Sequence, residues 1–196
     1  MARYPDLIVF PDPEAATGVT AGSAPGGAVA PVTTGWATLG PLRWRCALGA
    51  GGIRAVKHEG DGVTPAGRYP LRRLFYRPDR QARPGCRLPT VALARHDGWC
   101  DDPADPAYNR SVMLPYPASC EALWRDDAVY DLIVVVGHND TPPIAGAGSA
   151  IFIHCARPDF APTAGCVAFA PDDLQALLAA LSPASTIDIR AFPESF

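Results

Sequence analysis

The sequence predicts a mainly β fold (β-rich α+β), and three observations support this. Glycine and proline are frequent, with 18 and 22 residues in a chain of 196, which is typical of many turns. Apolar runs are short, and only one segment has apolar residues at helical spacing. Hydrophobic residues make up 48% of the chain, enough for one core. We therefore expect a single domain over residues 1–196, with short strands and one or two short helices.

The first expected elements are a strand and a hairpin. Residues 6–10 predict the strand, and the small and polar residues 14–34 predict a flexible loop insertion. Residues 35–39 and 42–48 flank a Gly-Pro pair and predict the hairpin. Apolar and polar residues alternate in its second arm. This alternation places Cys46 on the inward face, where a thiol is usually an inert small hydrophobe.

The middle of the chain is less regular. Residues 68–76 predict a strand, whereas residues 77–128 are rich in proline, with a short helix expected around residues 120–127. The run 131–137 is apolar and rich in β-branched residues, as in a strand buried on both faces. Residues 149–153 predict one more strand, which ends at His154.

One clear helix follows. Four leucines between residues 174 and 181 form a single apolar stripe. The helix begins near Asp172, where acidic side chains favour the positive helix end, and Ser182-Pro183 ends it. Residues 186–191 alternate again and predict the last strand.

Composition excludes several classes of function. The net charge is only −3 and there is no basic patch, so we expect no nucleic-acid partner. No apolar run is long enough for a membrane span. The start of the chain lacks the pattern of a signal peptide, so we expect a cytoplasmic protein, or a periplasmic one if a leader was removed. The six cysteines are scattered without a CxxC pair, so we expect neither a metal nor a cofactor. Without a leader we expect reduced thiols, whereas in an exported protein the even number of cysteines could form disulfides.

The segment from residue 151 to residue 181 carries the clearest chemical signal. A buried strand delivers His154, a short loop follows, and Gly165-Cys166 opens the next apolar segment. A glycine before a cysteine lets backbone N–H groups approach an oxyanion, here those of Gly165 and Cys166. A nearby histidine can take the thiol proton. The alternative is that Cys166 is a buried core thiol and His154 a hydrogen-bonded structural histidine.

Two motifs in this order resemble the L,D-transpeptidase catalytic domain (YkuD-type). The downstream motif is a strand ending in Ile-His, then Ser/Thr-His-Gly-Cys, an apolar residue and a helix with Asp-Leu near its start. The upstream motif is the strand entry Thr-Pro-x-Gly-x-Tyr/Phe. The matching residues are Ile153-His154, Thr163, Gly165-Cys166-Val167, Asp173-Leu174 and residues 62–69. The resemblance spans roughly residues 42–190 and implies a β-sandwich with Cys166 as nucleophile and His154 as base.

The chain departs from the family pattern at two positions. Ala164 stands where the family usually has a histidine, and Ala168 where it often has Arg or Asn. We hypothesise that His138 or Asn139 takes the place of that histidine, orienting His154 or binding substrate. The alternative is that both are local turn residues. 

Arg157 lies in a shortened loop between the histidine and the cysteine. We hypothesise that it binds a substrate carboxylate, as Thr163 would help to bind or orient substrate. The alternative for Arg157 is a solvated loop residue.

The resemblance implies acyl transfer on peptidoglycan stem peptides or muropeptides, at the L,D bond before a terminal D-alanine. We favour L,D-carboxypeptidase action in murein recycling, on the expected cytoplasmic location. The alternatives are L,D-transpeptidase cross-linking, D-amino-acid exchange, and a non-catalytic module that binds cell-wall peptides. The sequence does not indicate the oligomeric state.

Overall fold

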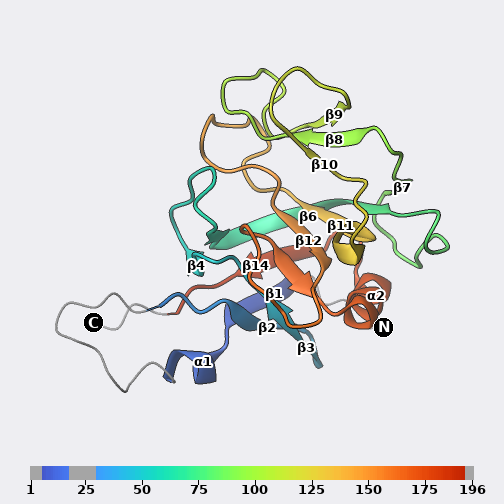
Figure 1. Ribbon diagram of the computed structural model, residues 1–196. Coiled ribbons are helices and arrows are strands. Elements are labelled where there is room, and N and C mark those ends of the chain that lie inside the picture. The colour runs from blue at the N-terminus through green and yellow to red at the C-terminus, as the bar shows by residue number, and fades with distance from the viewer. Residues whose placement is uncertain (1–5, 18–29, 193–196) are drawn as a thin grey trace.

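The structure is a computed structural model that describes residues 6–17 and 30–192. Its main part is a closed mixed sheet of eight strands (Figure 1). In spatial order these are β11 (Leu132–Val136), β12 (Phe152–Cys155), β13 (Val167–Phe169), β3 (Leu42–Ala47), β2 (Thr34–Leu39), β1 (Asp6–Pro11), β14 (Thr186–Ile189) and β6 (Gly67–Tyr76). The mainly β prediction is confirmed.

The long strand β6 closes this sheet into a barrel. Its first half pairs with β14 and its second half pairs antiparallel with β11. A register shift between Val134 and Val136 bends the ladder between β11 and β6. The short strand β7 (Thr90–Ala92) continues the sheet beside the far end of β6. Closure leaves β11 between two partners, which explains its uninterrupted apolar run.

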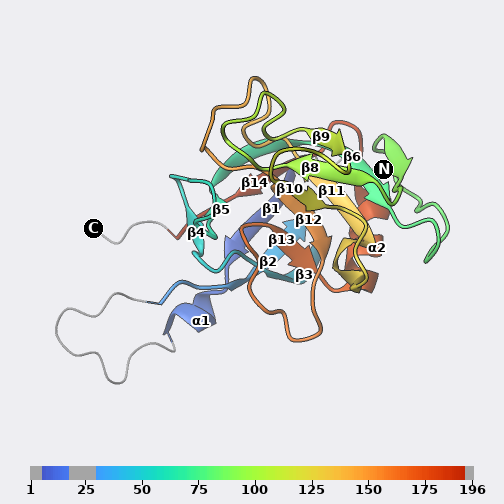
Figure 2. The same cartoon turned by 45° about the horizontal axis from the view of Figure 1, so that its top comes forward.

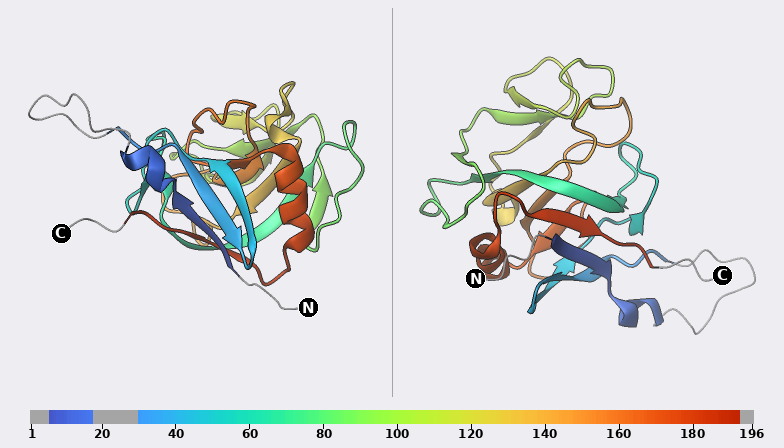
Figure 3. Two further views of the ribbon diagram at one scale, coloured as in Figure 1. Left: turned by 90° about the horizontal axis from the view of Figure 1, so that it is seen from below. Right: turned by 180° about the vertical axis from the view of Figure 1, so that it is seen from behind.

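The residues of β11 serve two cores. Leu132, Val134 and Val136 belong to the cluster inside the barrel, whereas Ile133 and Val135 belong to a second cluster outside it. The expected burial on both faces is therefore confirmed. Helix α2 (Pro171–Ala180), seen along one side of the barrel in Figure 3, packs its leucine stripe against the inner cluster.

A second, three-stranded sheet lies above the barrel in Figure 1, and Figure 2 shows it turned toward the viewer. We call it the capping sheet. It contains β8 (Asp97–Cys100), β9 (Ser111–Met113) and β10 (Cys120–Ala122). The apolar cluster outside the barrel, which includes Leu123, fills the space beneath it, and the ring of Trp99 contacts the ring of Phe152 in the barrel wall at a centroid distance of 5.3 Å.

Two expectations about local structure in the second half of the chain were wrong. The helix expected around residues 120–127 is strand β10, because pairing with β8 overrides weak local helix preference, and a 3₁₀ turn η1 (Ala128–Tyr130) follows. Strand β12 begins later than expected and runs through His154 rather than ending there. The histidine is thereby held by ladder pairing on both sides.

The remaining elements are short. Strands β4 (Ile53–Arg54) and β5 (Thr64–Pro65) form a small parallel pair. Residues 14–17, expected to begin a loop, lie in helix α1 (Pro13–Thr17), and residues 18–29 of that expected insertion lie outside the described residues. Among the described residues, no helix is long and apolar enough to span a membrane.

Candidate active site

His154 lies on the outer face of the barrel wall, beneath the capping sheet. In β12, Ile153 and Cys155 point into the barrel core, so the alternation of the strand turns His154 outward. Cys155 is therefore core, as expected. The His154 side chain is only 6% exposed, and the edge of its ring meets the ring of Tyr130 at a centroid distance of 5.4 Å.

The tautomer of His154 follows from one hydrogen bond. Nδ1 lies 2.9 Å from the carbonyl oxygen of Cys155. A carbonyl can only accept, so Nδ1 carries the proton and Nε2 has a free lone pair. Burial lowers the pKa of His154 to about 4, so the ring is neutral at pH 7. A neutral imidazole with a free Nε2 is able to accept a proton.

Cys166 lies immediately before β13 and lines the same cavity as His154. Its Sγ accepts the N–H of Phe152 at 3.3 Å and donates to the carbonyl of Ala150 at 3.3 Å. Burial, followed by the negative charge of Glu121, raises the pKa of Cys166 to about 12. The resting pair is therefore a thiol and a neutral imidazole, not a thiolate and an imidazolium.

The two sequence motifs meet at the loop before Cys166. Thr163 Oγ1 donates to the carbonyl of Cys166 at 2.7 Å and accepts the N–H of Gly165 at 3.1 Å. Thr64, from the upstream Thr-Pro motif, also donates to the carbonyl of Cys166, at 3.4 Å, and accepts the N–H of Gly49 at 2.8 Å. The upstream motif thus supports the loop that presents the cysteine, across 102 positions of sequence.

Gly165 cannot be replaced by a larger residue without strain. Its φ is +136°, and a Cβ atom there would lie 2.7 Å from the carbonyl oxygen of Val63. We expected the N–H of Gly165 to donate to an oxyanion. In the structure it already donates to Thr163 Oγ1 and is therefore not free to do so. Among the described residues, no bond is found for the N–H of Cys166, which remains the backbone donor available there.

Cys166 and His154 line one cavity of about 410 Å³ between the barrel wall and the capping sheet. Its lining includes charged side chains of both signs, namely Lys57, Arg125, Arg157, Glu59, Asp101 and Glu121. A cavity of this size holds one small ligand. Mixed charge suits a ligand with both ammonium and carboxylate groups.

Sequence reasoning missed Glu121 and Tyr130. Tyr130 donates to Glu121 Oε1 at 2.6 Å, and burial raises the pKa of Glu121. Glu121 comes from β10 of the capping sheet. No motif marks either residue, because only the packing of β10 on the barrel brings Glu121 to the cavity.

Comparison with known proteins identifies the family to which the chain belongs. Residues 36–189 match the family model of the L,D-transpeptidase catalytic domain, YkuD. The chain belongs to this family. Searches of curated proteins and of solved structures gave no match. The closed mixed sheet is consistent with the YkuD fold.

The L,D-transpeptidase domain lacks polar side chains at two of the positions singled out in the sequence. Ala164 and Ala168 both line the cavity, so methyl groups stand there. Sequence reasoning also missed Lys57, a cation close to Cys166. Its side chain is 5% exposed and forms an ion pair with Asp61. Its charge favours the thiolate of Cys166. The upstream motif was the signal for it, since Lys57 lies just ahead of Gly62.

The structure does not place His138 or Asn139 beside His154. They follow the end of β11, whereas His154 pairs with Ile133 near the beginning of that strand. The antiparallel register therefore separates them by several residues of strand length. Instead Nε2 of His138 donates to the carbonyl of Ala147 at 2.9 Å, and Asn139 Nδ2 donates to the carbonyls of Ile144 and Gly148. The expectation that one of them orients His154 was wrong, whereas the expectation that one of them binds substrate stays a prediction.

The loop residues lie at the cavity. Arg157 lines it with a half-exposed side chain, 3.8 Å from the carboxylate of Asp127. Thr163 lines it too, although its hydroxyl is engaged by the turn at Cys166. Of these two residues, Arg157 is therefore the one whose polar group is available to a ligand.

Proposed function

We propose that this domain performs cysteine-nucleophile acyl transfer on peptidoglycan stem peptides, cleaving the L,D bond before a terminal D-alanine. Membership of the family implies peptidoglycan peptide chemistry. The observation that carries the finer proposal is the convergence of Cys166 and His154 on one cavity of mixed charge. The Nδ1–H bond of His154 to the Cys155 carbonyl supports its role as base, because it leaves Nε2 able to accept.

The proposed reaction has two steps. Nε2 of His154 takes the thiol proton of Cys166 as Sγ attacks the peptide carbonyl, and the N–H of Cys166 with the charge of Lys57 stabilises the oxyanion. The imidazolium then protonates the nitrogen of D-alanine, which leaves, and a thioester remains on Cys166. Water or an amine resolves the thioester. Since burial disfavours both ions of the pair, proton transfer accompanies attack rather than preceding it.

We favour water as the acceptor, which makes the enzyme an L,D-carboxypeptidase. The capping sheet covers the cavity, whose volume of about 410 Å³ suits the end of one peptide better than two peptides together. The charged lining supports binding of a free chain end, because the half-exposed guanidinium of Arg157 suits the terminal carboxylate. The setting that we propose is cytoplasmic turnover of soluble tetrapeptides in murein recycling.

A second candidate is a module that binds wall peptides without turnover. Two observations favour it: the raised pKa of the Cys166 thiol, and the methyl groups of Ala164 and Ala168 at the cavity wall. A third outcome, cross-linking or exchange with a D-amino acid, needs an amine to reach the thioester.

Incubation with a disaccharide-tetrapeptide, with and without a D-amino acid, separates these outcomes by mass. We expect loss of D-alanine alone from the wild type, and a fall of at least about 10³-fold in turnover for Cys166→Ala. Cys86→Ala, which removes a half-buried thiol outside the cavity lining, should retain full turnover. Exchange products or dimers would mean transpeptidation. If the folded wild type binds the tetrapeptide but forms no product, the domain is a binding module without turnover.

A further inference from the structure

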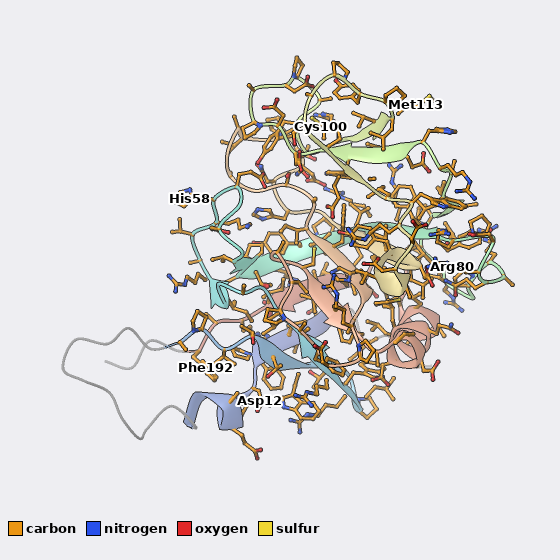
Figure 4. All side chains as sticks on the ribbon, in the orientation of Figure 1. Asp12, His58, Arg80, Cys100, Met113 and Phe192 are labelled. Carbon is orange, nitrogen blue, oxygen red and sulfur yellow. The ribbon has the colours of Figure 1, made fainter. Side chains whose placement is uncertain are left out.

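Two cysteines face each other in the capping sheet. Cys100 of β8 is directly opposite Cys120 of β10 in the antiparallel register. Cys100 is fully buried and Cys120 is half-buried, and both are free thiols. Figure 4 labels Cys100 in the layer above the barrel.

The hydrogen-bond pattern shows what kind of pair this is. The N–H of Asp101 donates to Ser119 at 3.2 Å and the N–H of Leu123 donates to Asp97 at 3.0 Å. Hydrogen-bonded and non-hydrogen-bonded pairs alternate along an antiparallel ladder, so the intervening pair of cysteines is non-hydrogen-bonded. Cα atoms of such pairs lie about 4.5 Å apart, within the range of about 4.4–6.8 Å that a disulfide accepts.

The side chains agree with the backbone. Directly opposed residues on an antiparallel pair project their side chains from the same face of the sheet, with Cβ atoms about 4.5–5.5 Å apart. Burial, followed by the neighbouring Cys100 thiol, raises the pKa of Cys120 to about 11. The strand register therefore places the two thiols opposite each other without any change in strand pairing.

We propose that Cys100 and Cys120 form a reversible disulfide that fixes the capping sheet over the cavity. Asp101 and Glu121, the chain neighbours of the two cysteines, both line the cavity. The bond would join β10 covalently to β8 and close the intervening loop, whose ends it holds together. It would thereby restrain the strand that carries Glu121, whatever reaction the cavity performs.

The oxidation requires a partner, for which a low-molecular-weight disulfide such as oxidised glutathione is suitable. The Cys120 thiolate, the more accessible one, attacks it, forming a mixed disulfide and releasing one glutathione thiol. The Cys100 sulfur then attacks the Cys120 sulfur of the mixed disulfide and releases the second glutathione thiol. Two protein S–H bonds and one S–S bond break, and one protein S–S bond and two glutathione S–H bonds form. Because thiolate is the attacking form, the raised pKa of Cys120 makes the reaction about tenfold faster per pH unit between pH 7 and 9.

The test is oxidation of the folded protein with oxidised glutathione at pH 8.5, followed by alkylation in denaturant and peptide mass mapping. We expect one peptide pair linked through Cys100 and Cys120, two hydrogens lighter, which a reductant separates. The loop closure should raise the melting temperature by about 5–10 °C. Cys120→Ser should lose both the link and the shift, whereas Cys86→Ser should keep both.

Three results would overturn the proposal. In the first, Cys100 and Cys120 of the wild-type protein stay unlinked although Cys86 has formed a mixed disulfide with glutathione. The adduct on Cys86 shows that the oxidant was active. Another is a stable glutathione adduct on Cys120 that Cys100 does not displace. The last is a linked protein with an unchanged or lower melting temperature. None of these readouts depends on turnover, so they are independent of the proposed function.

Discussion

At the scale of single residues, burial determines the chemistry of the site. His154 and Cys166 are each only 6% exposed, and desolvation disfavours the charged form of both groups. It lowers the pKa of the histidine and raises that of the cysteine. The pair is therefore neutral at rest, and in the reaction that we propose charge separates only as the thiol attacks the substrate carbonyl.

Burial of His154 also makes the stability of the fold depend on pH. Its pKa falls from 6.5, the value expected when unfolded, to about 4 in the fold. Between these values the unfolded chain binds more protons than the folded one, so stability falls as pH falls. This contribution to the free energy of unfolding should decrease by about 2 kcal/mol from pH 7 to pH 5.

Urea denaturation at the two pH values measures this effect. His154→Gln should lose about 2 kcal/mol less than the wild type over the interval, whereas His96→Gln, at an exposed position, should follow the wild type. Equal pH dependence in all three proteins would show that His154 is not buried in its neutral form.

At the scale of elements, Asn109 connects the capping sheet to the segment that precedes β12. Its Oδ1 accepts Nε1–H of Trp99 at 2.9 Å and the N–H of Ala150 at 3.1 Å. Its Nδ2 donates to the carbonyls of His138 and Asn139. The carbonyl of Ala150 in turn accepts from Cys166. Asn109 is therefore a positioning residue for the thiol, two hydrogen bonds away.

Asn109→Ala should lower kcat on the tetrapeptide about tenfold with little change in KM, because the thiol loses its fixed acceptor. Asn139→Ala is the matched control. Both asparagines have positive φ, 56° and 48°, so alanine adds similar backbone strain at either position. Both variants should lose about 1–3 kcal/mol of stability. Equal loss of kcat in the two would mean that Asn109 acts through stability alone.

At the scale of the whole molecule, the barrel depends on a strand outside the family match. The match begins at residue 36, yet β1 lies between β2 and β14 in the closed sheet. Leu7 and Val9 of β1 have no exposed surface. Without β1 two edges would open and the core would meet water.

Leu7→Ala should therefore lower the free energy of unfolding by about 2–5 kcal/mol, the usual range for a buried leucine. Ile8→Ala on the same strand should cost clearly less, because Ile8 lies on the other face and is half-exposed. Chemical denaturation of the two variants measures the difference. Similar small losses would mean that β1 adds little to the core.

Local pattern was sufficient for much of this molecule. Alternation in residues 42–48 predicted a strand with Cys46 inside, and the leucine stripe predicted α2, because these periods depend only on which face each side chain occupies. The two motifs around Thr64 and Cys166 indicated the family. Their order along the chain, rather than any contact, carried that information.

Tertiary structure alone decided the rest, because it depends on pairings between distant segments. The closure of β6 on β11 made the barrel, and the pairing of β10 with β8 turned an expected helix into a strand. The antiparallel register of β11 and β12 moved His138 and Asn139 away from His154. The same packing brought Glu121 and Tyr130 to the cavity and Cys120 to Cys100. Sequence by itself determined which residues are reactive types and which family holds them; register and burial determined which of them meet, and in which protonation state.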